Sequence, residues 1–160
     1  MDGIQIKESI ESFLSFVKDQ KPHDSPLEDL KTLSDHLYEI LMQGRRIQDK
    51  DVETSVEDVE PEKWPYKKRR EICTARFSIL GMYNLPEHIT HQIGETNWLI
   101  GDAIDDLADI IGDLQEVLWF YEKAYSNVAL WHFSFKYRSH WGYHAENLLW
   151  YLHALQREVE

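Results

Sequence analysis

The 160-residue sequence contains one cysteine, Cys73, and only seven glycines and five prolines. A single cysteine excludes an intrachain disulfide and any metal site built on a Cys-x-x-Cys pair, and Cys73 is expected to be a buried helix residue. The scarcity of glycine and proline argues against a β-rich fold with many tight turns. Basic residues are also few, with 17 Lys and Arg against 29 Asp and Glu and a formal net charge of −12. Such acidity disfavours nucleic-acid and membrane-surface binding, because both ligands are anionic.

Long apolar runs are missing as well. No segment approaches the roughly 18 consecutive apolar residues that span a bilayer. The opening residues, MDGIQIKESIESF, lack the basic and apolar regions of a secretory signal peptide. These absences predict a soluble, cytoplasmic protein. A chain of 160 residues can bury a continuous core, so we expect residues 1–160 to form a single helical domain.

Helical periodicity fills most of the chain. Apolar residues recur at three- and four-residue spacing over about residues 3–20, 25–44, 67–81, 98–123 and 127–155. This pattern predicts an all-α fold: a helical bundle of about five helices with a long C-terminal helix. We expect Ser25 and Glu28 to form a capping box at the start of the second helix, and Gly44 to end it. Gly142 disfavours the helix that contains it, which indicates either close packing by a neighbouring helix or a break.

Three segments interrupt or flank these helices. Residues 45–64 are acidic and poor in large apolar side chains, which predicts an exposed connection. Residues 82–96 contain Pro86 and Gly94 without a sustained period, which predicts a loop. The basic run from Lys67 to Arg70 is interpreted as a solvated helical turn. The alternative is that it binds the acidic connection or an acidic partner.

Six carboxylates form a stripe along one face of the predicted helix 98–123. Their spacing places all six within an arc of roughly 100°. They are Asp102, Asp105, Asp106, Asp109, Asp113 and Glu116. Like charges at this spacing destabilise a helix, so the stripe predicts neutralising groups from elsewhere. Three interpretations remain open: a solvated acidic face, a partner for basic and histidine side chains in an internal groove, or an oxygen-rich magnesium or manganese site.

A histidine pair offers a second candidate feature. His140 and His144 are four residues apart on a predicted helix, a spacing that can chelate a divalent metal such as zinc. If this helix packs against the stripe, Asp102, Asp106 and Asp109 are the predicted additional ligands. Alternatively, both histidines are interior residues that hydrogen-bond to carboxylates and hold two helices in register. The stripe residues farther along the helix, Asp113 and Glu116, are expected to be ordinary surface.

The second predicted helix adds another acidic row, formed by Glu28, Asp35 and Glu39. If both rows face one groove, the layout is similar in concept to the helical nucleotide pyrophosphatases, whose E-x-x-E and E-x-x-D motifs hold magnesium. The motif in this chain is D-x-x-D-D-x-x-D instead. The layout supports one functional hypothesis: a divalent-metal-dependent hydrolase, using Mg²⁺, Mn²⁺ or Zn²⁺, that acts on a small phosphorylated substrate.

Two segments of the C-terminal third resemble a known bacterial family. The first contains Asp106-Leu107-Ala108-Asp109-Ile110, and the second contains His140-Trp141-Gly142-x-His144. Over about residues 99–156 the chain is similar to the family catalogued as domain of unknown function 5063. The resemblance implies an all-α fold and a soluble bacterial protein, and it implies no activity.

Together these patterns favour a non-catalytic role over the hydrolase hypothesis. We expect the protein to bind an unknown protein partner or to assemble with itself. Exposed aromatic residues between Trp131 and Tyr151 are candidates for a subunit interface. Neither nucleic acid nor a membrane is an expected partner.

Overall fold

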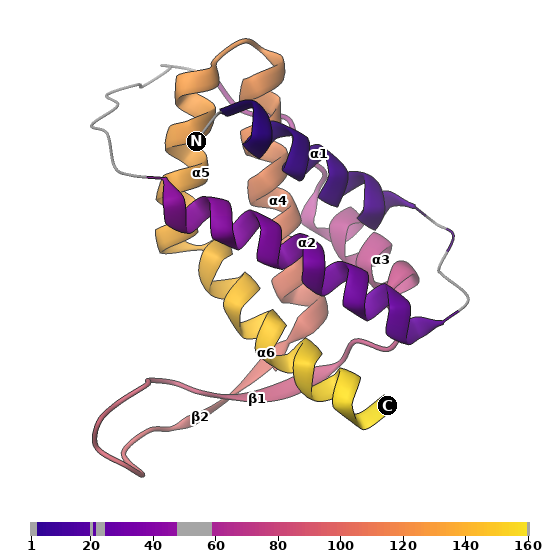
Figure 1. The fold of residues 1–160 in the computed structure, drawn as a ribbon, viewed down its shortest axis with the longest axis vertical. Coiled ribbons are helices and arrows are strands. Elements are labelled where there is room, and N and C mark those ends of the chain that lie inside the picture. Colours follow the sequence, from indigo (N-terminus) through magenta and orange to yellow (C-terminus); the bar gives the residue numbers. More distant parts are fainter. Residues whose placement is uncertain (1–2, 20, 22–24, 48–58, 160) are drawn as a thin grey trace.

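The computed structural model of the protein describes residues 3–19, 21, 25–47 and 59–159. The helices are α1 (Gly3–Lys18), α2 (Pro26–Arg46), α3 (Tyr66–Arg76), α4 (Ala103–Glu122), α5 (Ser126–Ser139) and α6 (Trp141–Val159). Two short strands, β1 (Met82–Pro86) and β2 (Trp98–Asp102), lie between α3 and α4. The predicted all-α bundle is confirmed, with six helices in the described part of the chain (Figure 1). None of these helices is both long and apolar enough to cross a membrane.

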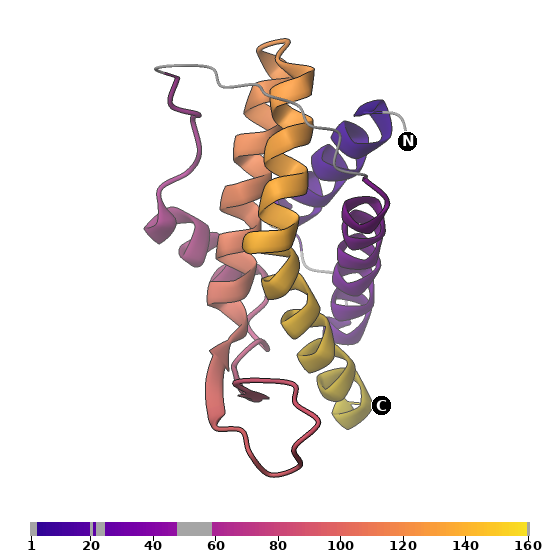
Figure 2. The ribbon, with the colours of Figure 1, turned by 90° about the vertical axis from the view of Figure 1, so that its left-hand side faces the viewer.

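Helix α4 lies at the centre of the bundle. It packs against α1, α3, α5 and α6, and Figure 2 shows it side by side with α5. Because neighbours surround it, α4 buries apolar residues such as Leu107 and Ile111 and also the acids Asp106, Asp113 and Glu116. A solvated acidic face is therefore the wrong interpretation for these three positions. The expectation that Asp113 and Glu116 are ordinary surface is also wrong.

The two N-terminal helices form one side of the bundle. The residues that α1 buries are those that its periodicity predicts: Ile6, Ile10, Phe13, Leu14 and Val17. Ser25 precedes α2, but its side chain makes no capping hydrogen bond, so the predicted capping box is wrong. Gly44 does not end α2, which continues to Arg46. Its missing side chain makes room for Tyr137, whose Cδ2 would lie 2.6 Å from a Cβ on Gly44.

The predicted loop after α3 contains an antiparallel hairpin. Met82 lies opposite Asp102, and Pro86 lies opposite Trp98. The strands are five residues each, and the connection between them is longer than a tight hairpin turn, so neither a turn motif nor a long alternation marks them in the sequence. As a result, α4 begins at Ala103 rather than at Trp98.

The predicted long C-terminal helix is two helices, α5 and α6, separated at His140. His140 has non-helical backbone angles (φ −151°, ψ −84°). Of the two interpretations of Gly142, the structure has the break. The start of α6 lies so close to the last turn of α5 that a Cβ on Gly142 would collide with the carbonyl oxygen of Tyr137. The break brings the start of α6 toward α4, where the candidate site lies.

Residues 48–58 of the predicted acidic connection lie outside the described residues. Near its end, Trp64 is half-buried and packs against the core. Cys73 is fully buried in α3, as expected, and burial raises the pKa of its thiol to about 12. A thiol with so high a pKa is protonated and unreactive at neutral pH.

Candidate metal centre

The N-terminal end of the acidic stripe is neutralised by α3. Arg70 lies 2.9 Å from Asp102 and 3.4 Å from Asp105, and Tyr66 also donates a hydrogen bond to Asp105. Asp102 is in addition the N-cap of α4, where its side chain accepts from the backbone N–H of Ile104 and of Asp105. The carboxylate of Asp102 therefore caps α4 and forms an ion pair with Arg70.

The basic run that supplies Arg70 is only partly solvated. Arg69 is buried, donates to the carbonyl oxygen of Trp64 and lies over Gly112, where a Cβ would come within 2.7 Å of its guanidinium carbon. Arg70 is half-buried in its ion pairs with α4. The interpretation of the whole run as a solvated turn is therefore wrong for these two residues, although Lys67 and Lys68 are exposed.

The C-terminal end of the stripe is neutralised by α5. Lys136 Nζ lies 2.9 Å from both Asp113 and Glu116, and His132 Nδ1 lies 3.1 Å from Glu116. Burial alone would raise the pKa of Glu116, but its contacts with His132 and Lys136 outweigh burial and hold this pKa at about 2. Burial also favours the neutral form of Lys136. The hydrogen bonds that Lys136 donates to Glu116 and Asp113 outweigh burial, so the pKa of Lys136 is raised.

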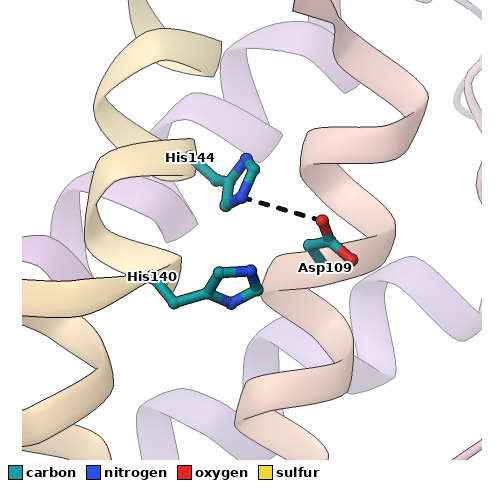
Figure 3. A group of neighbouring side chains, drawn as sticks. All are labelled: Asp109, His140 and His144. Carbon is teal, nitrogen blue, oxygen red and sulfur yellow. Dashed lines mark ion pairs between the residues drawn. The ribbon is translucent and has the colours of Figure 1, made fainter.

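Between these two ends, α4, α6 and the residue that precedes α6 bring three potential metal ligands together. Asp109, His140 and His144 each offer one ligand atom, and these atoms lie within 4.8 Å of one another. Figure 3 shows both imidazoles extending from the α5–α6 junction toward the Asp109 carboxylate on α4. His144 Nε2 lies 3.7 Å from Asp109 Oδ2. All three side chains are half-buried, with His140 the most accessible at 44% exposure.

Each histidine is held from behind by another carboxylate of the stripe. His144 Nδ1 lies 2.7 Å from Asp106 Oδ1, and His140 Nδ1 lies 2.6 Å from Asp113 Oδ2. A carboxylate acceptor at Nδ1 favours the tautomer that carries its proton there, which leaves the Nε2 lone pair available. Metal-bound histidines are usually oriented in this way.

The charge balance of the centre also favours a cation. The hydrogen bond to Asp106 raises the pKa of His144 even though burial opposes this effect. Burial, and then the nearby charge of Asp105, raises the pKa of Asp109. The shift of His144 reflects the carboxylates around it, whereas that of Asp109 reflects mainly its burial, and a bound proton or metal ion would offset both effects.

The structure separates the five predicted ligands into three groups. It brings Asp109, His140 and His144 together, it places Asp106 behind His144, and it directs Asp102 toward Arg70. The alternative interpretation, interior histidines that hydrogen-bond to carboxylates, also describes the pairs with Asp106 and Asp113. Sequence analysis missed the supporting role of Asp113, although its position four residues after Asp109 on the same face is a signal for it.

The second acidic row does not face this centre. Asp35 and Glu39 line a groove between α1 and α2, where Glu39 accepts hydrogen bonds from Ser9 and Gln43. The prediction of one groove lined by both acidic rows is therefore wrong. The candidate centre depends on α4 and the α5–α6 junction alone.

Comparison with known proteins assigns the family. A model of the family described as domain of unknown function (DUF5063) matches residues 3–158, most of the chain. The chain belongs to this family. The resemblance expected over residues 99–156 is thus confirmed, and the match also includes the N-terminal helices of this DUF5063 protein. The comparison with curated proteins gives no match.

A solved structure has a similar fold. It is the crystal structure of protein BF1032 from Bacteroides fragilis, with a TM-score of 0.70 and 16% sequence identity. The alignment covers 95% of the DUF5063 chain and 90% of BF1032. At this identity the similarity concerns the fold, so function has to be argued from the site.

Proposed function

We propose that this protein binds one divalent transition-metal ion through Asp109, His140 and His144. The observation that carries the proposal is the convergence of two imidazoles and one carboxylate, with ligand atoms within 4.8 Å of one another. Carboxylates behind both imidazoles add the outer support that metal-binding histidines usually have. A metal there would link the centre of α4 to the α5–α6 junction.

The ligand types favour zinc or a similar ion over magnesium. Imidazole suits Zn²⁺, Fe²⁺ and Ni²⁺, whereas Mg²⁺ prefers oxygen ligands and retains water. Zinc–nitrogen bonds are about 2.0–2.1 Å long, so ligand atoms on one ion lie roughly 3–3.5 Å apart. The ligand atoms would therefore approach one another on binding. Of the three side chains His140 is the most exposed, so its imidazole is the one we expect to move.

A second candidate function is metal-dependent hydrolysis of a small phosphorylated substrate. Three protein ligands are typical of catalytic zinc sites, because they leave a coordination position for a water molecule that the metal acidifies. The exposure of His140 supports access of substrate to that position. The non-catalytic alternative is that the ion has a structural role.

Metal titration tests the proposal. After dialysis against EDTA, the wild-type protein should bind one Zn²⁺ by calorimetry, and Co²⁺ should give the visible absorption of a low-coordinate site. The pair H140A/H144A and the single variant D109N should lose this binding. The double variant H88A/H91A is the matched control, because it removes two exposed histidines from the hairpin connection and should bind as the wild type does. Absence of zinc binding by the wild type, or its persistence in H140A/H144A, would contradict the proposal.

The hydrolase candidate is tested with the same variants. Zinc- or manganese-loaded protein should hydrolyse p-nitrophenyl phosphate, and H140A/H144A should not. If the protein binds one metal ion but does not hydrolyse the substrate, the metal-binding proposal stands and hydrolysis of small phosphorylated substrates is excluded.

A further inference from the structure

Among the described residues outside the helices, the most exposed large apolar side chains belong to the hairpin and its connection. Strand alternation places Met82, Trp98 and Ile100 on its outer face, and the connection adds Ile89 and Ile93. These five side chains are between 66% and 98% exposed. Figures 1 and 2 show the hairpin projecting from one end of the bundle, beyond the start of α4. Exposed apolar groups gathered on one element mark an interaction site.

The hydrogen-bond pattern identifies which backbone groups of the hairpin are unpaired. Ala103 N–H donates to Gly81, and Glu87 N–H donates to Asn97, so the odd-numbered residues of β2 face β1. Trp98 and Ile100 therefore direct their N–H and C=O groups to the free edge of β2. In the same way, Met82, Asn84 and Pro86 direct theirs to the free edge of β1.

The two edges differ in their protection. Proline, charge and bulges are the usual means by which an exposed strand edge avoids pairing with another chain. On β1, Pro86 removes an N–H from the free edge. From Trp98 to Gly101, β2 has no proline and no ionisable side chain. The edge of β2 is therefore the one open to another strand.

We propose that two copies of this protein pair antiparallel through their β2 edges, with the twofold axis at Leu99. Trp98 then lies opposite Ile100 of the partner subunit. Both members of this pair direct their backbone groups outward, so they can exchange hydrogen bonds. A shift that centred the axis on Ile100 would instead place Trp98 opposite Asp102 of the partner subunit, a charged residue. The register at Leu99 keeps the interface apolar.

Symmetry favours a second copy as the occupant, because the apolar side chains of Trp98 and Ile100 flank Leu99 and lie opposite each other across a twofold axis at that residue. Charge limits where two copies can meet, because a formal net charge of −12 repels a second copy over most of the surface. The β2 edge is uncharged, and the nearest acid, Asp102, is neutralised by Arg70. A twofold axis also lets the same short segment serve both subunits, which is the usual form of a homodimer. The product is a four-stranded sheet, with more mutual support than an isolated two-stranded hairpin has.

Mass measurement is the first test. We expect light scattering to give twice the 19.1 kDa chain mass for the wild type and the monomer mass for Ile100→Lys, which places a charge on the edge. Ile89→Lys is the matched control, because it adds the same charge to the exposed connection and should remain dimeric. A monomeric wild type, a dimeric I100K variant or a monomeric I89K variant would overturn the proposal.

Cross-linking tests the register. Opposed residues in a non-hydrogen-bonded antiparallel pair have Cα atoms about 4.5 Å apart, which a disulfide can bridge. Leu99→Cys should therefore form a disulfide-linked dimer on mild oxidation, and Ile89→Cys should not. The native Cys73 is buried and does not interfere. Equal cross-linking of the two variants would reject the axis at Leu99.

Discussion

His144 Nδ1 lies 2.7 Å from Oδ1 of Asp106, across the interface between α6 and α4. The other oxygen of Asp106 accepts a 2.5 Å hydrogen bond from Tyr83 on β1. Tyr83 reaches this position because its ring lies over Gly101, where a Cβ would come within 2.5 Å of the ring. The hairpin thus contributes to the orientation of a proposed metal ligand through Asp106.

Removal of the Tyr83 hydroxyl should weaken metal binding. Tyr83→Phe keeps the ring that stacks on Tyr151 and removes only the hydrogen bond to Asp106. Outer-sphere groups of this kind typically contribute 10- to 100-fold to metal affinity, so we expect a loss of about tenfold. Competition with a chelator of known zinc affinity measures this loss of affinity. The exposed Tyr143, replaced by Phe, is the control. Equal affinities of Y83F and the wild type would show that the Tyr83 hydrogen bond to Asp106 does not support the metal ligand His144.

Metal affinity should depend on pH through His144. The hydrogen bond to Asp106 raises the pKa of His144 above 6.5, and a metal ligand has to be unprotonated. Zinc affinity should therefore begin to fall at a pH above 6.5 as acid is added. In the metal-free protein the sign is opposite: the stability from protonated His144 is complete below pH 6.5 and is lost as pH rises through the raised pKa. Zinc affinity and the free energy of unfolding of the metal-free protein, each measured from pH 5 to 9, check the two expectations. A zinc affinity that does not depend on pH would exclude His144 as a ligand.

Local patterns in the sequence predicted the helices and part of the site. Periodicity is a local property, so it identified the buried face of α1, and the four-residue spacing of His140 and His144 identified that pair. The sequence did not separate Asp102 from the cluster of three ligands, because the start of α4 depends on β2. That strand forms only by pairing with β1, across a connection that no local rule marks.

Burial of the stripe was not predictable in the same way. Asp113 is buried because Lys136 and His140 come from α5 and from the break that follows it. The break in turn requires the contact between Gly142 and the carbonyl of Tyr137. In the sequence, a glycine inside a periodic run indicates either a contact or a break, and only tertiary packing decides between them.

The break at His140 should be sensitive to a single methyl group added at Gly142. A Cβ at this position collides with backbone, which cannot move aside as a flexible side chain can. We expect Gly142→Ala to lower the free energy of unfolding by about 3 kcal/mol, the upper end for overpacking. It should also weaken zinc binding, since His140 lies at the break. Gly81→Ala is the control, because its Cβ would meet only the Tyr151 hydroxyl, at 3.8 Å. Urea unfolding compares the two, and similar losses in both would contradict this explanation of the break.

Glu116 should govern part of the acid unfolding of the protein. Its pKa is about 2 in the folded chain, against an ordinary value of 4.5, because contacts with His132 and Lys136 outweigh burial. The stabilisation is therefore present above pH 4.5 and is lost as pH falls from 4.5 toward 2. A shift of this size corresponds to a contribution on the order of 3 kcal/mol. Glu116→Gln should be destabilised at neutral pH and should show a shallower loss of stability between pH 4.5 and 2. The exposed Glu146→Gln should retain the wild-type slope, and an unchanged slope in E116Q would show that this carboxylate does not stabilise the folded state.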